Sequence, residues 1–222
     1  MGGHFMKAYL CAAIVAIGMA APAQAQQGDF PNLWIAATAG FDSTRAKVSY
    51  EDSGDPTNDF AIDESTSGVT FGGALGYDIP IAPSWYLGIE GSADFADNKR
   101  CEEVFGSDAA CFSLKRNLAA GVRVGTAVGK STLFYVGGAY VNGKARASYT
   151  DQVDPTNNIA ASDTRDGYRL STGIEQRLGG NFFAKAEYRY SDYKDYSVSD
   201  GVESVSLGFD RHQAVVGLGV RF

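Results

Sequence analysis

Apolar and polar residues alternate along most of the chain after residue 32. In the last ten residues, every second position is apolar, which places those side chains on one face of a strand of period two. These positions are Ala214, Val216, Leu218, Val220 and Phe222. Eight stretches alternate in this way or are apolar throughout: 33–41, 68–78, 85–95, 114–126, 132–141, 167–178, 182–191 and about 204–222. We find no convincing helical period after the N-terminal region, so the pattern predicts an all-β chain.

The connections between the predicted strands alternate in length. Short connections follow the second, fourth and sixth strands, at 79–84, 128–131 and 179–181. Long polar connections, expected to be loops, follow the first, third, fifth and seventh. Short turns at one end, long loops at the other and an even strand count are typical of an antiparallel up-and-down barrel.

Charge decides which face of the predicted strands meets water. The polar phases carry eight basic and four acidic residues, namely Lys115, Arg123, Arg169, Arg177, Lys185, Arg189, Arg211 and Arg221 with Glu90, Asp94, Glu175 and Glu187. A soluble barrel that holds an apolar ligand has no room for so many charges, whereas a membrane barrel has a polar lumen inside an apolar sheath. We therefore predict an eight-stranded antiparallel up-and-down transmembrane β-barrel, with short turns and both termini in the periplasm.

Aromatic residues near the strand ends predict two interfacial girdles, as membrane barrels have at both surfaces. We expect Trp34, Tyr77, Trp85 and Phe222 at the lower one and Phe95, Tyr188, Tyr190 and Tyr193 at the upper one.

The lumen of an eight-stranded barrel is about wide enough for side chains to fill. Buried charges are tolerated when they are paired and hydrogen-bonded. We expect the three lumenal glutamates to pair with Arg123, Arg177, Arg189 or Lys185. The sequence leaves open whether this network plugs the lumen or leaves a narrow conduit.

An internal repeat indicates a four-strand unit used twice. Residues 49–58 recur at 148–157, where Asp-Pro-Thr-Asn occurs in both copies. At the same offset Arg45 corresponds to Lys144 and Lys47 to Arg146. Convergence of similar loops is the alternative. The fifth strand is apolar in both phases, and the repeat predicts that Phe134, Val136, Gly138 and Tyr140 face outward.

The N-terminal region has the pattern of a secretory signal. One lysine, Lys7, precedes an apolar run from Ala8 to Ala21, and Ala23-Gln24-Ala25 supplies small residues at the cut. We predict a cleaved signal peptide at 1–25 and a barrel domain at 26–222.

Composition limits the kinds of binding partner and ligand that we expect for the chain. Without Lys7 the chain has 18 basic against 26 acidic residues, which argues against nucleic acid. Cys101 and Cys111 remain after cleavage, and an even pair in an exported chain predicts a disulfide. The predicted loops are acidic, but their Asp-Pro-Thr-Asn segments are turn sequences without the spacing of a calcium loop, so we expect no metal site and no cofactor.

The closing part of the chain resembles a known family. Gly173-Ile174-Glu175, the run from Phe182 to Tyr193 and the terminal Gly217 to Phe222 are similar to the closing hairpin and last strand of the opacity-type, outer membrane protein A-like eight-stranded barrels. The resemblance covers the whole predicted barrel in architecture and about the last 60 residues in motif.

The resemblance implies surface-exposed structural, antigenic or adhesive roles, sometimes slight pore activity, and no shared active site. It also implies that the C-terminal strand carries the signal for the barrel assembly machinery, although Val220 stands where an aromatic residue is usual. The residues concerned are Val216, Leu218, Val220 and Phe222.

We expect a non-enzymatic, monomeric protein of the Gram-negative outer membrane that contributes to envelope integrity and displays loops to an unidentified host or surface ligand. Outer-membrane lipid and lipopolysaccharide are its expected surroundings. A low-conductance porin is the alternative, and a lipid-modifying enzyme is the third hypothesis. A serine nucleophile needs a base, and the only histidine after the signal, His212, has Ala214 rather than a serine two residues on.

Overall fold

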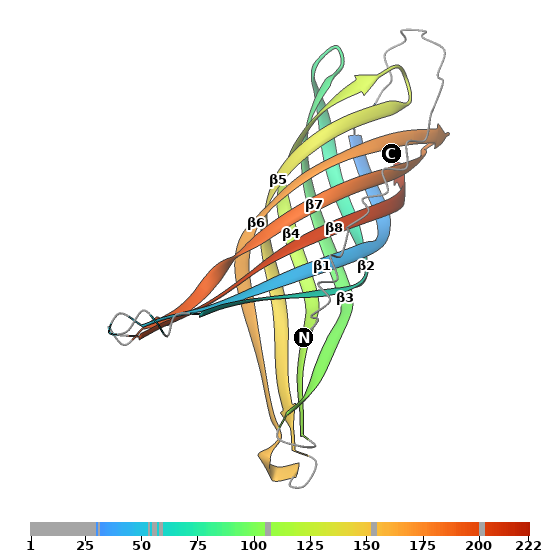
Figure 1. The fold of residues 1–222 in the computed structure, drawn as a ribbon. Helices are drawn as coiled ribbons and strands as arrows, with labels where there is room; N and C mark the ends of the chain where they lie inside the picture. The colour runs from blue at the N-terminus through green and yellow to red at the C-terminus, as the bar shows by residue number, and fades with distance from the viewer. Residues whose placement is uncertain are drawn as a thin grey trace, which may run out of the picture.

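The computed structural model describes residues 30, 32–52, 54, 57, 60–104, 108–151, 155–199 and 203–222, which form a closed barrel of eight antiparallel strands (Figure 1). Each strand pairs with the next along the chain, and β8 pairs with β1. The strands are β1 (Asn32–Asp52), β2 (Phe60–Ala82), β3 (Trp85–Val104), β4 (Asp108–Val128), β5 (Thr132–Thr150), β6 (Ile159–Gly179), β7 (Phe182–Ser199) and β8 (Glu203–Arg221), with a short 3-10 helix, η2 (Pro155–Asn157), between β5 and β6. The predicted signal peptide lies outside the described residues.

The prediction of eight strands is confirmed, but that of long polar loops is wrong. Most of the residues assigned to those loops continue the strands, which run for 18 to 23 residues each. The reason is that the extensions are paired by backbone hydrogen bonds, while parts of them, such as residues 159–164 on β6, have side chains exposed on both faces and so lack the apolar alternation that marks a strand. Among the described residues, no helix is long and apolar enough to span a membrane.

Short connections join the strands at one end, here called the turn end. Left-handed glycines make two of these connections possible: Gly129 has a φ of 68° and Gly180 a φ of 54°, and only glycine adopts such values without steric cost. The opposite end, where the strand extensions lie, is called the hairpin end.

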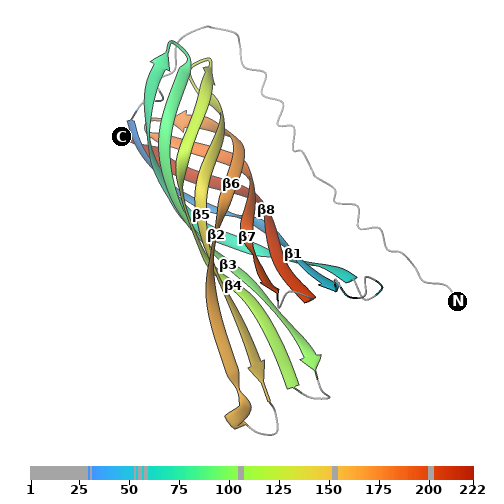
Figure 2. The same ribbon diagram turned by 90° about the vertical axis from the view of Figure 1, so that its left-hand side faces the viewer.

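At the hairpin end the barrel divides into two arms. The β2–β3 pairing stops at Thr70 and Ala96, and the β6–β7 pairing stops at Gly167 and Tyr193. The other pairings continue further, so β7, β8, β1 and β2 form one four-stranded arm and β3 to β6 form the other. The two arms diverge in both views (Figures 1 and 2).

The apolar face of the closed barrel points outward. Phe41 and Leu218 are 75% and 65% exposed, whereas Asp42, Gly217 and Gly219 in the opposite phase are buried. This arrangement is the reverse of a soluble protein and is that of a barrel surrounded by lipid. The outward orientation predicted for β5 is correct, because Phe134, Val136 and Tyr140 are exposed and Leu133 and Tyr135 are buried.

The register of the strands agrees with the internal repeat. Asp42 pairs with Gly68 across β1 and β2. The residues 99 positions further on, Val141 and Gly167, pair across β5 and β6. The two hairpins therefore share one register as well as similar sequences, which favours a repeated unit over chance similarity of loops.

The predicted disulfide is present. Cys101 and Cys111 are directly opposed on β3 and β4 and are bonded to each other. The bond joins the two strands in the part of the arm that lies beyond the closed barrel.

Candidate functional site

The lumen is filled by a charge-balanced set of side chains. We call this set of twelve residues the lumenal network: Arg123, Arg169, Lys185, Arg189, Arg211 and Arg221 with Asp42, Asp78, Glu90, Asp94, Glu175 and Glu187. Every member lies within 4.0 Å of an opposite charge from the same set. The network is therefore neutral, and each charge that it buries is compensated.

In the half of the lumen near the turn end, two arginines lie between two carboxylates. Arg123 donates to Asp78 at 2.9 Å through Nε and lies 3.6 Å from Glu175 through Nη2. Arg221 donates two hydrogen bonds to Glu175, at 2.6 and 3.0 Å, and lies 2.9 Å from Asp78. The planar guanidinium suits such paired contacts, since it offers donors in a fixed fork.

Aromatic rings enclose these cations. The guanidinium of Arg123 lies 4.4 Å from the ring centre of Trp34 and 4.8 Å from that of Tyr135. Arg221 lies 5.5 Å from the rings of both Phe30 and Phe183. The prediction that Trp34 belongs to the lower girdle is wrong, because its side chain is 0% exposed and faces the lumen. Its even position on β1 places it there, in the phase opposite to Leu33.

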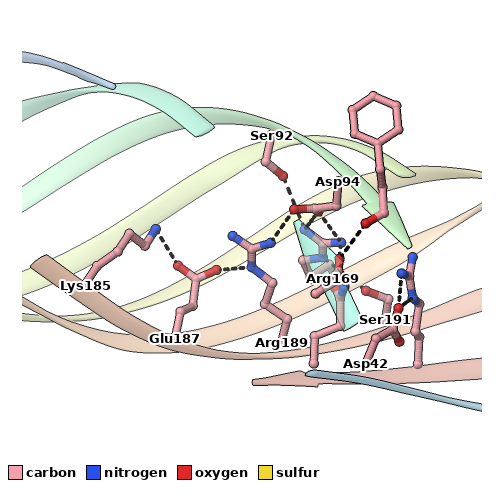
Figure 3. Close-up of polar contacts among 12 residues, drawn as sticks. Asp42, Ser92, Asp94, Arg169, Lys185, Glu187, Arg189 and Ser191 are labelled. Atoms are coloured by element: carbon pink, nitrogen blue, oxygen red, sulfur yellow. Dashed lines mark hydrogen bonds and ion pairs between the residues drawn. The ribbon is translucent and has the colours of Figure 1, made fainter. Parts of the chain in front are cut away.

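In the middle of the lumen, β7 supplies alternating charges. Lys185 lies 2.7 Å from Glu187, which also bonds Arg189 (Figure 3). Arg189 reaches Asp94 on β3 at 2.9 Å, and Arg169 on β6 contacts the same carboxylate at 3.4 Å. One chain of contacts therefore spans the barrel from β7 through β3 to β6.

The network ends near the hairpin end with Arg211 and Asp42, which are bonded to each other. Above them Tyr193 stacks on Phe209 with ring centres 4.5 Å apart. The prediction that Tyr193 belongs to the upper girdle is wrong, because only 3% of it is exposed. It lies on the odd, lumenal phase of β7, and a hollow of about 10 Å³ beside it holds no more than a water molecule.

Two predicted members of the network lie outside it. Lys115 is exposed at a β-bulge between Leu114 and Arg116. Arg177 lies at the turn end and donates to the carbonyl of Gly180. Both share the lumenal phase of their strands, but Lys115 lies within β4 at the bulge and Arg177 lies near the end of β6, and both are accessible to solvent.

Sequence reasoning missed Asp42 and Asp78, both 1% exposed. Asp42 lies one residue beyond the predicted end of the first strand, and Asp78 is the last residue of the predicted second strand. Each therefore resembles a polar residue that ends a strand. Their even positions, in phase with lumenal Thr38 and Ala74, are the sequence signal that could have placed them in the lumen.

His212 lies on the outward face of β8. The hydroxyl of Tyr188 is 2.6 Å from its Nδ1, and Asp210 is 3.3 Å from its Nε2. Ser43 is its cross-strand neighbour on β1, but the hydroxyl contact of Ser43 is with Ser67. Both imidazole nitrogens therefore face groups other than a serine.

The acidic residues of the arms show no metal centre. Among the described residues, no group of three or more histidine, cysteine or carboxylate side chains is placed to hold an ion. Asp108 instead accepts a hydrogen bond from Tyr149, and this bond raises the pKa of Tyr149 to about 12 because ionisation would place two negative charges together.

An apolar outer face around a charge-filled lumen defines the class: a transmembrane β-barrel of the outer-membrane type. Comparison of the sequence with family models agrees. Residues 10–222 match the outer membrane protein beta-barrel domain, and the chain belongs to that family. The protein is thus an eight-stranded barrel of the Gram-negative outer membrane.

Individual relatives match the chain over a shorter stretch or with lower sequence identity. A 22 kDa outer membrane protein of Rhizobium leguminosarum bv. viciae is 40% identical over 63 residues, which cover 28% of this chain and 29% of that protein. Neisserial surface protein A has 15% identity and a TM-score of 0.48, covering 86% of this chain and 97% of its own. The outer membrane protein OprG of Pseudomonas aeruginosa has 13% identity and a TM-score of 0.47, covering 89% and 99%.

Proposed function

We propose that this protein is a non-enzymatic, non-conducting barrel that contributes to the integrity of the outer membrane and displays its two arms outside the cell. The barrel assembly machinery and outer-leaflet lipid, including lipopolysaccharide, are its proposed partners. The proposed state is a monomer, and the closed order of the described strands supports it because it leaves no strand edge at membrane depth for pairing with a second copy.

The observation that carries the proposal is the filled lumen. Six cations and six carboxylates compensate one another across it, and aromatic rings cover the cations near the turn end. An ion entering this lumen would have to separate buried ion pairs, and breaking one such pair costs about 3–5 kcal/mol. That barrier opposes the second hypothesis, a low-conductance porin.

Single-channel recording in planar bilayers tests the proposal. The wild-type protein is expected to give no steps under conditions in which a general porin gives reproducible ones. Reproducible steps that change when Arg123 or Glu187 is replaced would contradict the proposal and favour the porin.

The absence of enzymatic function is supported by the contacts of His212. Its two nitrogens face Tyr188 and Asp210, so it is not poised to activate a hydroxyl nucleophile. We expect a His212→Ala strain to retain the wild-type profile of lipid A species by mass spectrometry. Loss of one modified species in that strain, restored by the wild-type gene, would support the lipid-modifying enzyme instead.

A further inference from the structure

The outward positions of β5 change in character from the middle of the barrel toward the hairpin end. Phe134 and Val136 are exposed and apolar, and Tyr140 follows as an exposed aromatic. Next comes Asn142, which donates to Asp166 at 2.8 Å, and then Lys144 and Arg146 in the same phase. The series runs from apolar residues through an aromatic residue to cations. This order matches the layers of a membrane surface, from hydrocarbon through the interface to the headgroups.

A third cation lies beside these two on the outward face. Arg116 on β4 pairs directly with Lys144, and it shares the outward phase of exposed Leu118. Like charges at directly opposed positions repel each other. We call Arg116, Lys144 and Arg146 the β4–β5 cation cluster.

Within the described residues, no member of the cluster has an ion pair. The cross-strand neighbours of Lys144 and Arg146 on β6 are Thr164 and Ser162, which carry no charge. Asp166, which lies opposite Asn142 on that face, accepts hydrogen bonds from Tyr140 and Asn142. The absence of an ion pair among the described residues of this cluster contrasts with the fully paired lumen.

The other half of the barrel carries corresponding cations with a different environment. Arg45 and Lys47 occupy the repeat positions of Lys144 and Arg146 on β1. Here β8 supplies Asp210, which is directly opposite Arg45 and forms an ion pair with Lys47 at 3.5 Å. The two halves therefore carry two cations each at the same register, with an ion pair on β1 and none among the described residues around β5.

The height of the cluster suits a lipid phosphate. Lys144 is four residues beyond Tyr140, about 13 Å along the strand and about 10 Å along the membrane normal for a strand tilted by about 40°. Long basic side chains extend back toward the interface while their stems cover apolar surface. Their charges thus come to the level of the lipid headgroups, where each contributes to binding of anionic lipid.

We propose that the β4–β5 cation cluster binds phosphate groups on the glycolipid of the outer leaflet. The cluster is continuous with the lipid-facing surface, which makes a membrane lipid its occupant. This proposal rests on the outer-membrane location and on the lipid partner proposed above, and it is independent of whether the lumen conducts.

The test measures the binding of purified lipopolysaccharide to the refolded full chain in detergent. A Lys144→Gln, Arg146→Gln double variant is compared with Arg45→Gln, Lys47→Gln, which removes the same charge from the repeat positions. We expect the first pair to weaken binding roughly 10- to 30-fold and the second less than about threefold, because Asp210 already neutralises part of that site. Enzymatically dephosphorylated lipopolysaccharide should lose most of its binding to the wild-type chain.

The proposal is overturned if the two double variants lose affinity equally, if neither does, or if dephosphorylated lipopolysaccharide binds as well as the parent. Unboiled migration on gels reports folding of each variant. Should the double variant not fold, the single change Arg146→Gln at an exposed position is expected to weaken binding several-fold, and Lys144→Arg is expected to retain it. Channel recording on the same preparations tests the closed lumen separately.

Discussion

At the scale of single residues, the lumen is held together by arginines that each serve more than one carboxylate. Arg123 contacts Asp78, Glu175 and Glu90, so its removal would leave three acidic groups with one cation fewer between them. Because the pairing is shared, removing one member of the network costs more folding free energy than removing one partner of an isolated surface ion pair.

Replacing Arg123 by methionine is therefore expected to destabilise the folded barrel by about 3–5 kcal/mol, because buried carboxylates lose their partner. Arg177→Met is the matched control, since Arg177 lies at the turn end with its side chain partly in solvent, and its change should be within about 0.5 kcal/mol. Urea unfolding in lipid vesicles measures both. Equal destabilisation by the two changes would show that Arg123 has no special role.

A second prediction concerns Tyr149, whose hydroxyl donates to Asp108 in the arm. Its folded pKa of about 12 exceeds the ordinary value of 10.0, so the stabilising contribution of this bond is fully present below about pH 10 and is lost as the pH rises through about 12. Ultraviolet titration should show a tyrosine that ionises near pH 12 and that shifts toward 10 in Asp108→Asn. An unchanged titration curve in that variant would refute the assignment, and Tyr149→Phe identifies the signal.

At the scale of elements, the strands combine a closed barrel and two protruding arms. Sequence alternation predicted the closed part well, because one face must meet lipid and the other the charged lumen. It failed in the arms, where Ser162, Asp163 and Thr164 on β6 are all exposed, so that both faces of the strand meet solvent and impose no phase. It also misplaced Trp34 and Tyr193, because residue type was weighed above position in the strand.

The individual ion pairs were beyond prediction for a related reason. Alternation shows that Glu187 and Arg189 face the lumen, but Asp94 meets Arg189 only because β3 and β7 lie across the barrel from each other. That juxtaposition depends on closure and stagger, which no single strand encodes.

The disulfide is expected to stabilise its arm and not the barrel. Cys101 and Cys111 are ten residues apart in sequence, so their bond should stabilise the β3–β4 hairpin by about 2–3 kcal/mol. In a Cys101→Ser, Cys111→Ser variant, hydrogen exchange should accelerate in the arm while the closed barrel keeps its protection. Faster exchange throughout the barrel would contradict this separation.

Phe222, the residue after β8, supports a prediction about assembly. Phe222 is 65% exposed on the lipid-facing side, and its backbone nitrogen donates to the carbonyl of Leu33 at 2.9 Å. Deleting Phe222 should slow assembly into the outer membrane in cells and leave the lumenal network intact. Outer-membrane fractionation measures how much of the shortened chain is assembled. Normal assembly would refute the predicted role of Phe222 in the assembly signal.

At the scale of the whole molecule, the protein is turned inside out relative to a soluble barrel. Its two tryptophans, the only ones in the chain, lie on opposite sides of the wall. Trp85 is 50% exposed on the outward face of β3, and Trp34 is enclosed in the lumen beside Arg123. They offer a matched pair of reporters for the two environments.

Quenching of tryptophan fluorescence by brominated lipids tests this arrangement most directly. Trp34→Phe leaves Trp85 as the single reporter, and Trp85→Phe leaves Trp34. In vesicles of lipid brominated near the headgroup, Trp85 should be strongly quenched and Trp34 much more weakly, because one contacts acyl chains and the other lies behind the barrel wall. Equal quenching of the two, or stronger quenching of Trp34, would contradict a lipid-facing apolar surface around a filled polar lumen.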